Sequence, residues 1–311
     1  MQRRTLFAAF PAIGLTMATS LRAQPTSEAL KVSSGGEKGT YFQLMKEFDA
    51  ARPGLIQNTV SDGSLTNIDS VVGNKAELGI TQLDTLVFRS QKEGNLKDRV
   101  RVLAVLHAEE IHFIAKAAGR TEGGYGAMGV SVGGRTVFLN SINDLKGRKV
   151  GVWGGAIVTE QILANMALTG WMPVEYSGQK DAVAALQSDQ IDAILAVGGQ
   201  PLVWVGDLSR DYKLLEVPDS VANRLSSVYE KASLTYRNLG QDGIPSLAVR
   251  CMLVTQKYKG KAKREALQKL HDQLVGAVDD IRETRGTHPK WSEIDPAATT
   301  DRWPMYLTTV K

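Results

Sequence analysis

The sequence predicts an α/β protein with two lobes that share a cleft. Short apolar, strand-like runs alternate with segments of helical periodicity, which is typical of a sheet covered by helices. A strand, a glycine turn and a helix follow one another twice, first near Gly35 and again near Gly154. At 311 residues the chain can bury one large core or two modest ones. Together these observations favour two similar α/β halves.

Residues 1–23 have the features of a secretory signal peptide. Arg3 and Arg4 give a positive start, residues 6–17 are largely apolar, and Leu21-Arg-Ala23 is an acceptable cleavage site. The arginine pair also resembles a twin-arginine export motif, and an ordinary secretory signal stays the alternative. We therefore expect this segment to be removed and the mature protein to be periplasmic.

The net charge gives little support for a nucleic-acid partner. The formal charge is +4, but Arg3, Arg4 and Arg22 belong to the segment expected to be removed. Without them, 37 basic residues become 34 against 33 acidic ones, which is a balance of +1. No later stretch is long and apolar enough for a membrane helix. We expect no nucleic acid among the partners.

The first half begins with a strand at residues 29–34 and a turn that contains Gly35 and Gly39. Apolar residues at helical spacing then run from Tyr41 to Phe48. This unit invites a phosphate-binding interpretation, but it lacks both the GxxxxGK[ST] and the GxGxxG pattern. Tyr41 either contacts a ligand at the helix start or packs on the sheet.

Residues 61–84 predict a turn, a helix and a buried strand. Ser64 is expected to cap the helix, because its hydroxyl can accept a bond from a free backbone N–H. The strand ends at Gln82 and Asp84. Because free N–H groups and the helix dipole point the same way, a helix start beside this strand end should attract anions.

Residues 100–106 and 111–116 predict two further strands. Residues 119–134 hold seven glycines and no apolar period, which indicates a loop or a hairpin. The formal GxGxxG at residues 124–129 has no strand before it and no helix after it. We therefore do not interpret it as a nucleotide site.

The second half begins at Ile142 and repeats the arrangement of the first. A strand at residues 148–153 leads through Gly154 into a helix that we expect to stop at Gly170. A short helix and a strand at residues 190–197 follow, and the strand ends in a glycine-proline turn. Trp153, at a strand end, is either a platform for a ligand or a packing residue.

Residues 246–255 predict a strand that crosses back to the first half, and residues 261–283 give the clearest helix in the chain. The tail that follows is expected to pack on the surface. Cys251 is the single cysteine, so no internal disulfide is expected and we interpret it as a small core residue. The apolar stripe of the long helix is Leu267, Leu270, Leu274, Val278 and Ile281.

Three passages resemble the TAXI family, the extracytoplasmic solute receptors of TRAP transporters. They are Gly35-Gly-Glu-Lys-Gly39-Thr-Tyr41, then Gly63-Ser64 with Asn67 and Glu77-Leu-Gly-Ile-Thr-Gln82-Leu-Asp84, and Ile142-Asn-Asp-Leu-Lys-Gly-Arg-Lys-Val-Gly-Val152. The resemblance implies a two-lobed type II periplasmic binding protein-like fold, with hinge strands and a cleft between the lobes. We place lobe I at residues 24–116 plus 250–311, and lobe II at residues 117–249.

The resemblance also implies a function. A receptor of this family closes its lobes around a small solute, such as an amino acid or an organic acid, and docks on TRAP membrane subunits. The ligand contacts expected here are Gly39, Thr40, Tyr41, Ser64, Asn67, Gln82, Gly154, Gly155, Ala156, Thr159, Gly199 and Pro201. The family usually has small hydroxylated residues where this chain has Gly155 and Ala156, which leaves the ligand class open. No arginine stands at these positions, so no clamping guanidinium is expected.

Two alternatives stay open: the same receptor feeding a sensor kinase, and a secreted enzyme on a two-lobed fold. No serine lies in a GxSxG elbow. His107 and His112 are five residues apart, so they would not share the helix face that HExxH requires. We expect no catalytic residue, no cofactor and no metal site, and we interpret His112 as a satisfied strand or loop residue.

Overall fold

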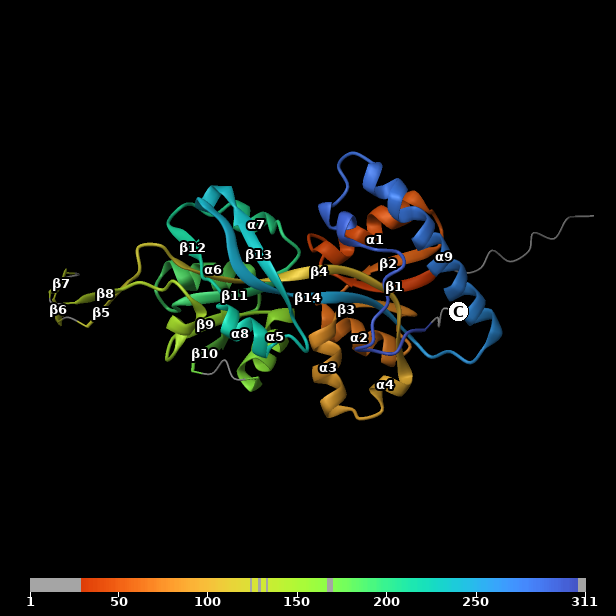
Figure 1. Cartoon of the computed structure of the whole chain (residues 1–311), viewed down its shortest axis with the longest axis horizontal. Coiled ribbons are helices and arrows are strands. Elements are labelled where there is room, and N and C mark those ends of the chain that lie inside the picture. Colours follow the sequence, from red (N-terminus) through yellow and green to blue (C-terminus); the bar gives the residue numbers. More distant parts are fainter. Residues whose placement is uncertain (1–28, 124, 128–129, 133, 167–169, 307–311) are drawn as a thin grey trace, which may run out of the picture.

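The computed structural model describes residues 29–306, except residues 124, 128–129, 133 and 167–169. The signal peptide predicted at residues 1–23 therefore lies outside the described residues. Two α/β lobes lie side by side along the long axis of the molecule (Figure 1). The α/β, two-lobed fold class predicted from the sequence is confirmed.

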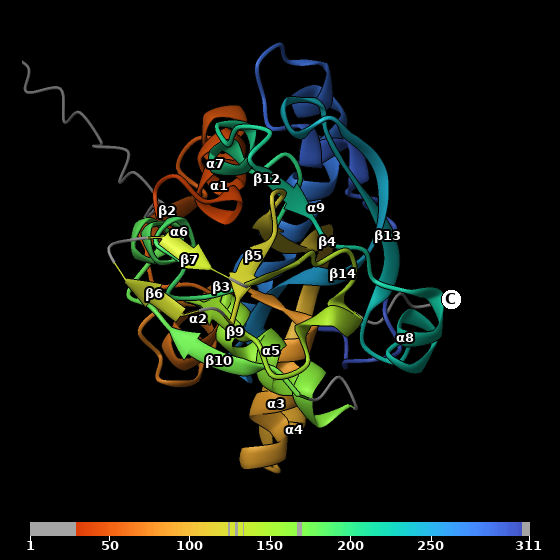
Figure 2. The ribbon, with the colours of Figure 1, turned by 90° about the vertical axis from the view of Figure 1, so that its left-hand side faces the viewer.

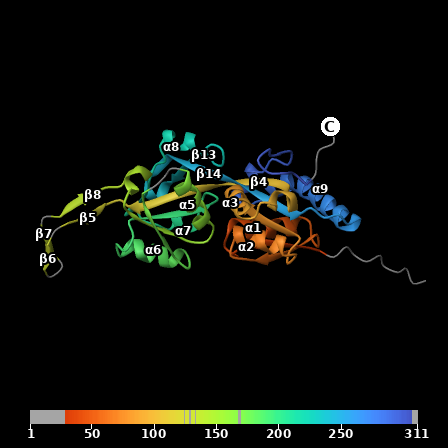
Figure 3. The ribbon, with the colours of Figure 1, turned by 90° about the horizontal axis from the view of Figure 1, so that it is seen from below.

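A ten-stranded sheet runs through both lobes of the described chain, in the order β10-β9-β11-β4-β14-β3-β1-β2, with β12 paired to β4 and β13 to β14. Its two central strands, β4 (Val100–Lys116) and β14 (Gln241–Gln256), are antiparallel and extend from one lobe into the other (Figure 3). The prediction that the chain crosses back near residues 246–255 is confirmed. Within the described residues, β4 and β14 carry the chain between the lobes.

The lobe that contains the N-terminal half has parallel strands flanked by helices. Its helices cover both faces of the sheet, and α9 lies at the far end of the molecule (Figures 1 and 3). Its elements are β1 (Leu30–Gly35), α1 (Thr40–Ala51), β2 (Ile56–Val60), α2 (Ser64–Val72), β3 (Leu78–Gln82), α3 (Leu83–Lys92), α4 (Leu96–Arg99) and α9 (Lys261–Glu283). The predicted apolar stripe of α9 is confirmed, because Leu267, Leu274 and Ile281 are all buried in the core that α9 shares with α1 and β1.

The other lobe repeats the parallel strand–helix pattern around β9 and β11. Its elements are η1 (Ile142–Leu145), β9 (Lys149–Val152), α5 (Gly155–Asn165), β10 (Met172–Glu175), α6 (Gln179–Gln187), β11 (Ala193–Gly198), α7 (Val203–Gly206), β12 (Tyr212–Leu214), α8 (Asp219–Arg224), β13 (Glu230–Tyr236) and η2 (Arg237–Leu239). Helix α5 ends at Asn165, five residues before the predicted stop at Gly170.

The glycine-rich region near residue 120 forms a hairpin, which is one of the two forms that the sequence predicts. Strands β5 (Arg120–Glu122) and β8 (Arg135–Val137) pair, and so do β6 (Tyr125–Ala127) and β7 (Val130–Val132). The hairpin projects away from the lobe at one end of the molecule and is nearest the viewer in Figure 2. The described residues of this region continue as the strands β6, β7 and β8, and not as the helix that a dinucleotide-binding motif would require after its strand.

Two sequence expectations about the first half are wrong. Residues 100–106 and 111–116 form one strand, because the polar residues between them keep pairing with β14. Ser64 is not the N-cap of α2: Gly63 takes that place with φ 104°, a conformation that favours glycine. The Ser64 hydroxyl instead accepts a bond from the Gln82 backbone N–H at 3.3 Å.

The C-terminal tail is built into the protein rather than laid on its surface. Trp291, in the short helix η3 (Pro289–Glu293), and Trp303 are each only 1% exposed. Trp303 Nε1 donates to the Val100 carbonyl at 3.1 Å, which fixes the tail to the start of β4. The expectation of a surface tail is therefore wrong, because two large aromatic rings contribute to the cores. No helix in the described residues has the length and hydropathy to cross a bilayer.

Candidate ligand-binding cleft

A cleft of about 590 Å³ lies between the two lobes, and the starts of three helices open on it. Helices α1 and α2 contribute from one lobe and α5 from the other. The first N–H groups of a helix have no partner within the helix, and the helix dipole makes this end partly positive. The cleft therefore presents three separate donor groups to an anionic or polar guest.

Eight of the twelve residues expected to contact a ligand line this cleft. The other four, Asn67, Thr159, Gly199 and Pro201, are not part of its lining. The eight are Gly39, Thr40 and Tyr41 of the α1 start, Ser64 of the α2 start, Gln82 at the end of β3, and Gly154, Gly155 and Ala156 of the α5 start. The two strand–glycine turn–helix units of the sequence thus face each other across the cavity.

The Asn67 side chain is fully buried and its hydrogen bonds are used within the lobe. Its Oδ1 accepts from Ser33 Oγ at 2.7 Å and from Ser61 Oγ at 2.5 Å, and its Nδ2 donates to the Ile80 carbonyl at 2.7 Å. Asn67 therefore fixes α2 against β1 and β3 and positions the α2 start, and both lone pairs of its Oδ1 are already used.

Thr159 joins the two lobes beside the cleft instead of lining it. Its hydroxyl donates to Asp84 Oδ2 at 2.7 Å, and the Tyr229 hydroxyl donates to the same oxygen at 3.0 Å. Burial raises the pKa of Asp84, and these hydrogen bonds offset part of the increase. The contact ties α3 of one lobe to α5 of the other.

Gly199 and Pro201 belong to the turn after β11, next to the cleft-lining residues Gly198 and Leu202. A Cβ on Gly199 would lie 3.0 Å from Lys290 Cε, so the turn packs against the tail. The Gln200–Pro201 peptide bond is cis. The turn therefore supports the wall of the cleft through its neighbours.

The floor of the cleft contains a carboxylate that the sequence reasoning missed. Glu109 Oε2 accepts from the Tyr41 hydroxyl at 2.8 Å and from Gln82 Nε2 at 2.7 Å. Burial alone would raise the pKa of Glu109, but His107 together with the bonds from Gln82 and Tyr41 outweighs it and lowers the pKa. The floor therefore holds a negative charge at neutral pH.

A β-bulge shapes this floor. Met252 pairs with Val105 and Arg250 with Ala108, so the single residue Cys251 opposes two residues of β4, of which His107 is one. On its other side Cys251 pairs with Gln82 of β3. Bulges re-aim side chains near functional sites. This one brings His107, Cys251 and Glu109 together beneath the cavity.

Tyr41 and Trp153 each had two interpretations in the sequence, and Cys251 was interpreted as a small core residue. Tyr41 lines the cleft and also packs edge-on to His107, with ring centroids 6.0 Å apart. Trp153 lines the cleft and packs on Trp204 at 5.8 Å. Burial, followed by the charge of Glu109, raises the pKa of the Cys251 thiol, so on its own it is a poor nucleophile.

His112 is a satisfied strand residue, as predicted. Nδ1 donates to the Glu110 carbonyl at 3.0 Å, and Nε2 accepts from the Tyr236 hydroxyl at 2.9 Å. The Tyr236 oxygen in turn accepts from the Leu202 N–H at 2.9 Å. His112 therefore belongs to the structural support behind the cleft.

The fold and the cleft define a two-lobed α/β protein with a ligand-sized cavity between its lobes. The chain belongs to the NMT1-like family, whose model matches residues 33–259. The match starts in β1 and ends just after β14, so it includes both lobes and every strand of the large sheet except the first residues of β1. No curated protein matches the sequence.

Solved structures with similar folds are distant in sequence. Protein AF1704 from Archaeoglobus fulgidus is 13% identical with a TM-score of 0.49, over 87% of this chain and 84% of its own. The GluR0 ligand-binding core in complex with L-glutamate is 14% identical with a TM-score of 0.49, over 82% and 96%. The alkanesulfonate-binding protein SsuA from Xanthomonas axonopodis pv. citri, bound to MOPS, is 15% identical with a TM-score of 0.48, over 88% and 86%. The two-lobed assignment rests on the strand order and the cleft described above.

Proposed function

We propose that this protein is an extracytoplasmic solute-binding receptor that closes its two lobes around a small organic acid or amino acid. The observation that carries the proposal is the cleft, in which helix starts from both lobes open on one cavity of about 590 Å³. A solute that contacts both sides binds the closed form more tightly and shifts the protein towards it. The strands β4 and β14 supply the hinge in this proposal.

The lining of the cleft favours a guest with an acidic group. The N–H groups at the starts of α1, α2 and α5 are donors suited to a carboxylate. The carboxylate of Glu109 at the floor would repel a second acidic group and attract an ammonium group. Within the proposed class, an amino acid therefore fits better than a dicarboxylate.

Delivery to TRAP-type membrane subunits, and the TAXI subfamily itself, are proposed from the resemblance of the three sequence passages. A periplasmic location is proposed from residues 1–23, which have the composition of a signal peptide. Deletion of the gene is expected to abolish uptake of the solute. Loss of a transcriptional response with normal uptake would instead favour the sensor alternative.

The test of binding is a thermal-shift screen of purified protein against amino acids and small mono- and dicarboxylic acids. A ligand at about 100 times its Kd adds roughly 2.7 kcal/mol of stability, which raises Tm by about 5 °C in a protein of this size. Native mass spectrometry of protein purified from its host identifies a co-purified solute independently. If no member of the panel shifts Tm at millimolar concentration, the proposed ligand class is wrong.

A substitution in the cleft tests whether the solute binds at this site. A Cβ at position 155 would lie 3.4 Å from Gln82 Oε1 across the cleft, so Gly155→Leu is expected to fill the cavity and abolish the ligand-induced shift. Gly276→Leu is the matched control, because that glycine lies in α9 with open space around its Cβ position. Equal ligand-induced shifts in both variants would contradict the cleft as the binding site.

A further inference from the structure

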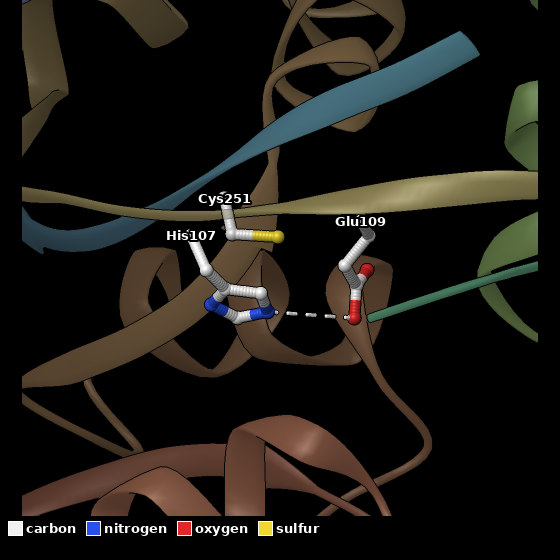
Figure 4. A group of neighbouring side chains, drawn as sticks. All are labelled: His107, Glu109 and Cys251. Carbon is white, nitrogen blue, oxygen red and sulfur yellow. Dashed lines mark ion pairs between the residues drawn. The ribbon is translucent and has the colours of Figure 1, made fainter. Parts of the chain in front are cut away.

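We propose that His107, Glu109 and Cys251 form a site for Zn²⁺ at the floor of the cleft. One donor atom from each of the three side chains lies within 4.8 Å of the other two. Figure 4 shows the His107 ring and the Cys251 sulfur on the same side of the strands as the Glu109 carboxylate. His107 and Glu109 lie in β4 and Cys251 lies in β14, at the bulge where these two paired strands change register.

The strongest sign of a missing partner is His107. Its side chain is fully buried, and neither ring nitrogen has a hydrogen-bond partner among the described residues. Its Nε2 lies 3.9 Å from Glu109 Oε1, which is too long for a hydrogen bond. A cation between these two atoms would give Nε2 the partner that it lacks.

The spacing of the donors fits a small tetrahedral ion. Zinc bonds of about 2.0–2.3 Å place neighbouring ligand atoms roughly 3.4–3.6 Å apart. The observed cluster is slightly wider, so small side-chain rotations would close it around the metal. An imidazole, a thiolate and a carboxylate suit Zn²⁺, whereas Mg²⁺ and Ca²⁺ prefer oxygen ligands alone. On binding, the Cys251 thiol would release its proton to solvent.

Glu109 has the hydrogen bonds that commonly orient a carboxylate that binds a metal. Gln82 Nε2 and the Tyr41 hydroxyl both donate to Oε2, which fixes the carboxylate and leaves Oε1 for the ion. Three protein donors leave a fourth tetrahedral position. Glu109 and Tyr41 line the cleft, so that position would face the cavity and hold a water molecule.

Zinc binding is measured without any solute, so its outcome is independent of the receptor proposal. The untagged chain is treated with a chelator, desalted and titrated with Zn²⁺ by calorimetry, and then with Co²⁺ by absorption spectroscopy. Stoichiometric zinc binding is expected. A thiolate-to-Co²⁺ charge-transfer band is also expected, and it can come only from Cys251 because the chain has one cysteine.

Variants identify the other ligands. His107→Gln, Glu109→Gln and Cys251→Ser are each expected to weaken zinc binding at least about tenfold, and Cys251→Ser also removes the Co²⁺ band. His271→Gln, on the surface of α9, is the control and is expected to bind as the wild type does. Absence of the charge-transfer band in the wild type, or unchanged zinc affinity in folded Cys251→Ser and His107→Gln, would overturn the proposal. If a variant fails to fold, the wild-type Co²⁺ spectrum still decides the question.

Discussion

The buried histidine behind the cleft should make the protein sensitive to acid, and His112→Gln should remove part of that sensitivity. His112 is fully buried, and burial lowers its pKa from 6.5 to about 4. The folded protein therefore keeps His112 neutral at pH values where the unfolded chain has already bound a proton. The stability that this provides is complete above pH 6.5 and is lost as the pH falls towards 4.

The magnitude follows from the two pKa values. With 6.5 in the unfolded chain and about 4 in the folded protein, linkage gives a loss of about 2 kcal/mol between pH 7 and pH 5. Urea unfolding at these two pH values measures the total loss, to which other groups contribute as well. The difference between the wild type and His112→Gln isolates the His112 contribution. Glutamine can still offer an oxygen to the Tyr236 hydroxyl, so the polar network is not left without an acceptor.

The expected result is that the variant loses about 2 kcal/mol less than the wild type when the pH is lowered from 7 to 5. His271→Gln makes the same substitution on α9, away from this network, and tests whether the loss of any histidine has this effect. The reasoning is refuted if His112→Gln loses as much stability as the wild type, or if His271→Gln reproduces its behaviour.

Two further substitutions test packing and the contact between the lobes. Gly79→Ala should destabilise the protein by about 1–3 kcal/mol, because the new Cβ would lie 2.9 Å from the Asn67 carbonyl oxygen of α2. The same change at Gly276 meets open space and should stabilise α9 by about 0.5–1 kcal/mol, so equal urea midpoints for the two variants would contradict the packing argument. Thr159→Val removes a donor to the buried Asp84 carboxylate and should cost roughly 1.5–3 kcal/mol in urea unfolding. An unchanged unfolding free energy would show that this contact does not join the lobes energetically.

Local periodicity predicted the elements that depend on local contacts. The apolar positions of α1 and α9 recur every three or four residues, and the structure buries them as expected. The prediction of Ser64 as a cap failed because a glycine with positive φ precedes it, and the hydrogen bond of the serine is made to β3 instead. A propensity for capping cannot show that a partner far along the chain will compete for the same hydroxyl.

The residues at the floor of the cleft could not all be predicted, because their proximity depends on contacts that a single sequence does not reveal. His107 and His112 were assessed at helical spacing, whereas in a strand residues two apart, such as His107 and Glu109, face the same side. Recognising the polar interruption of residues 100–116 as part of a continuous strand would have placed Glu109 beside His107. The proximity of Cys251 could not have been found in this way, because it depends on the register of β14 and on the bulge.

Neighbouring carboxylates on β4 show how one strand can serve both the cleft and the hinge. Side chains of Glu109 and Glu110 point to opposite faces of the sheet, as successive residues of a strand do. Glu109 faces the cavity, whereas Glu110 Oε1 accepts from the buried Lys290 Nζ of the tail at 2.6 Å and its Oε2 from the Gln200 N–H at 2.6 Å. Because Gln200 belongs to one lobe and Lys290 packs with the other, Glu110 joins the lobes on the face away from the ligand. A solute bound near Glu109, as proposed above, would therefore contact a strand whose opposite face is held by the tail and by the turn after β11.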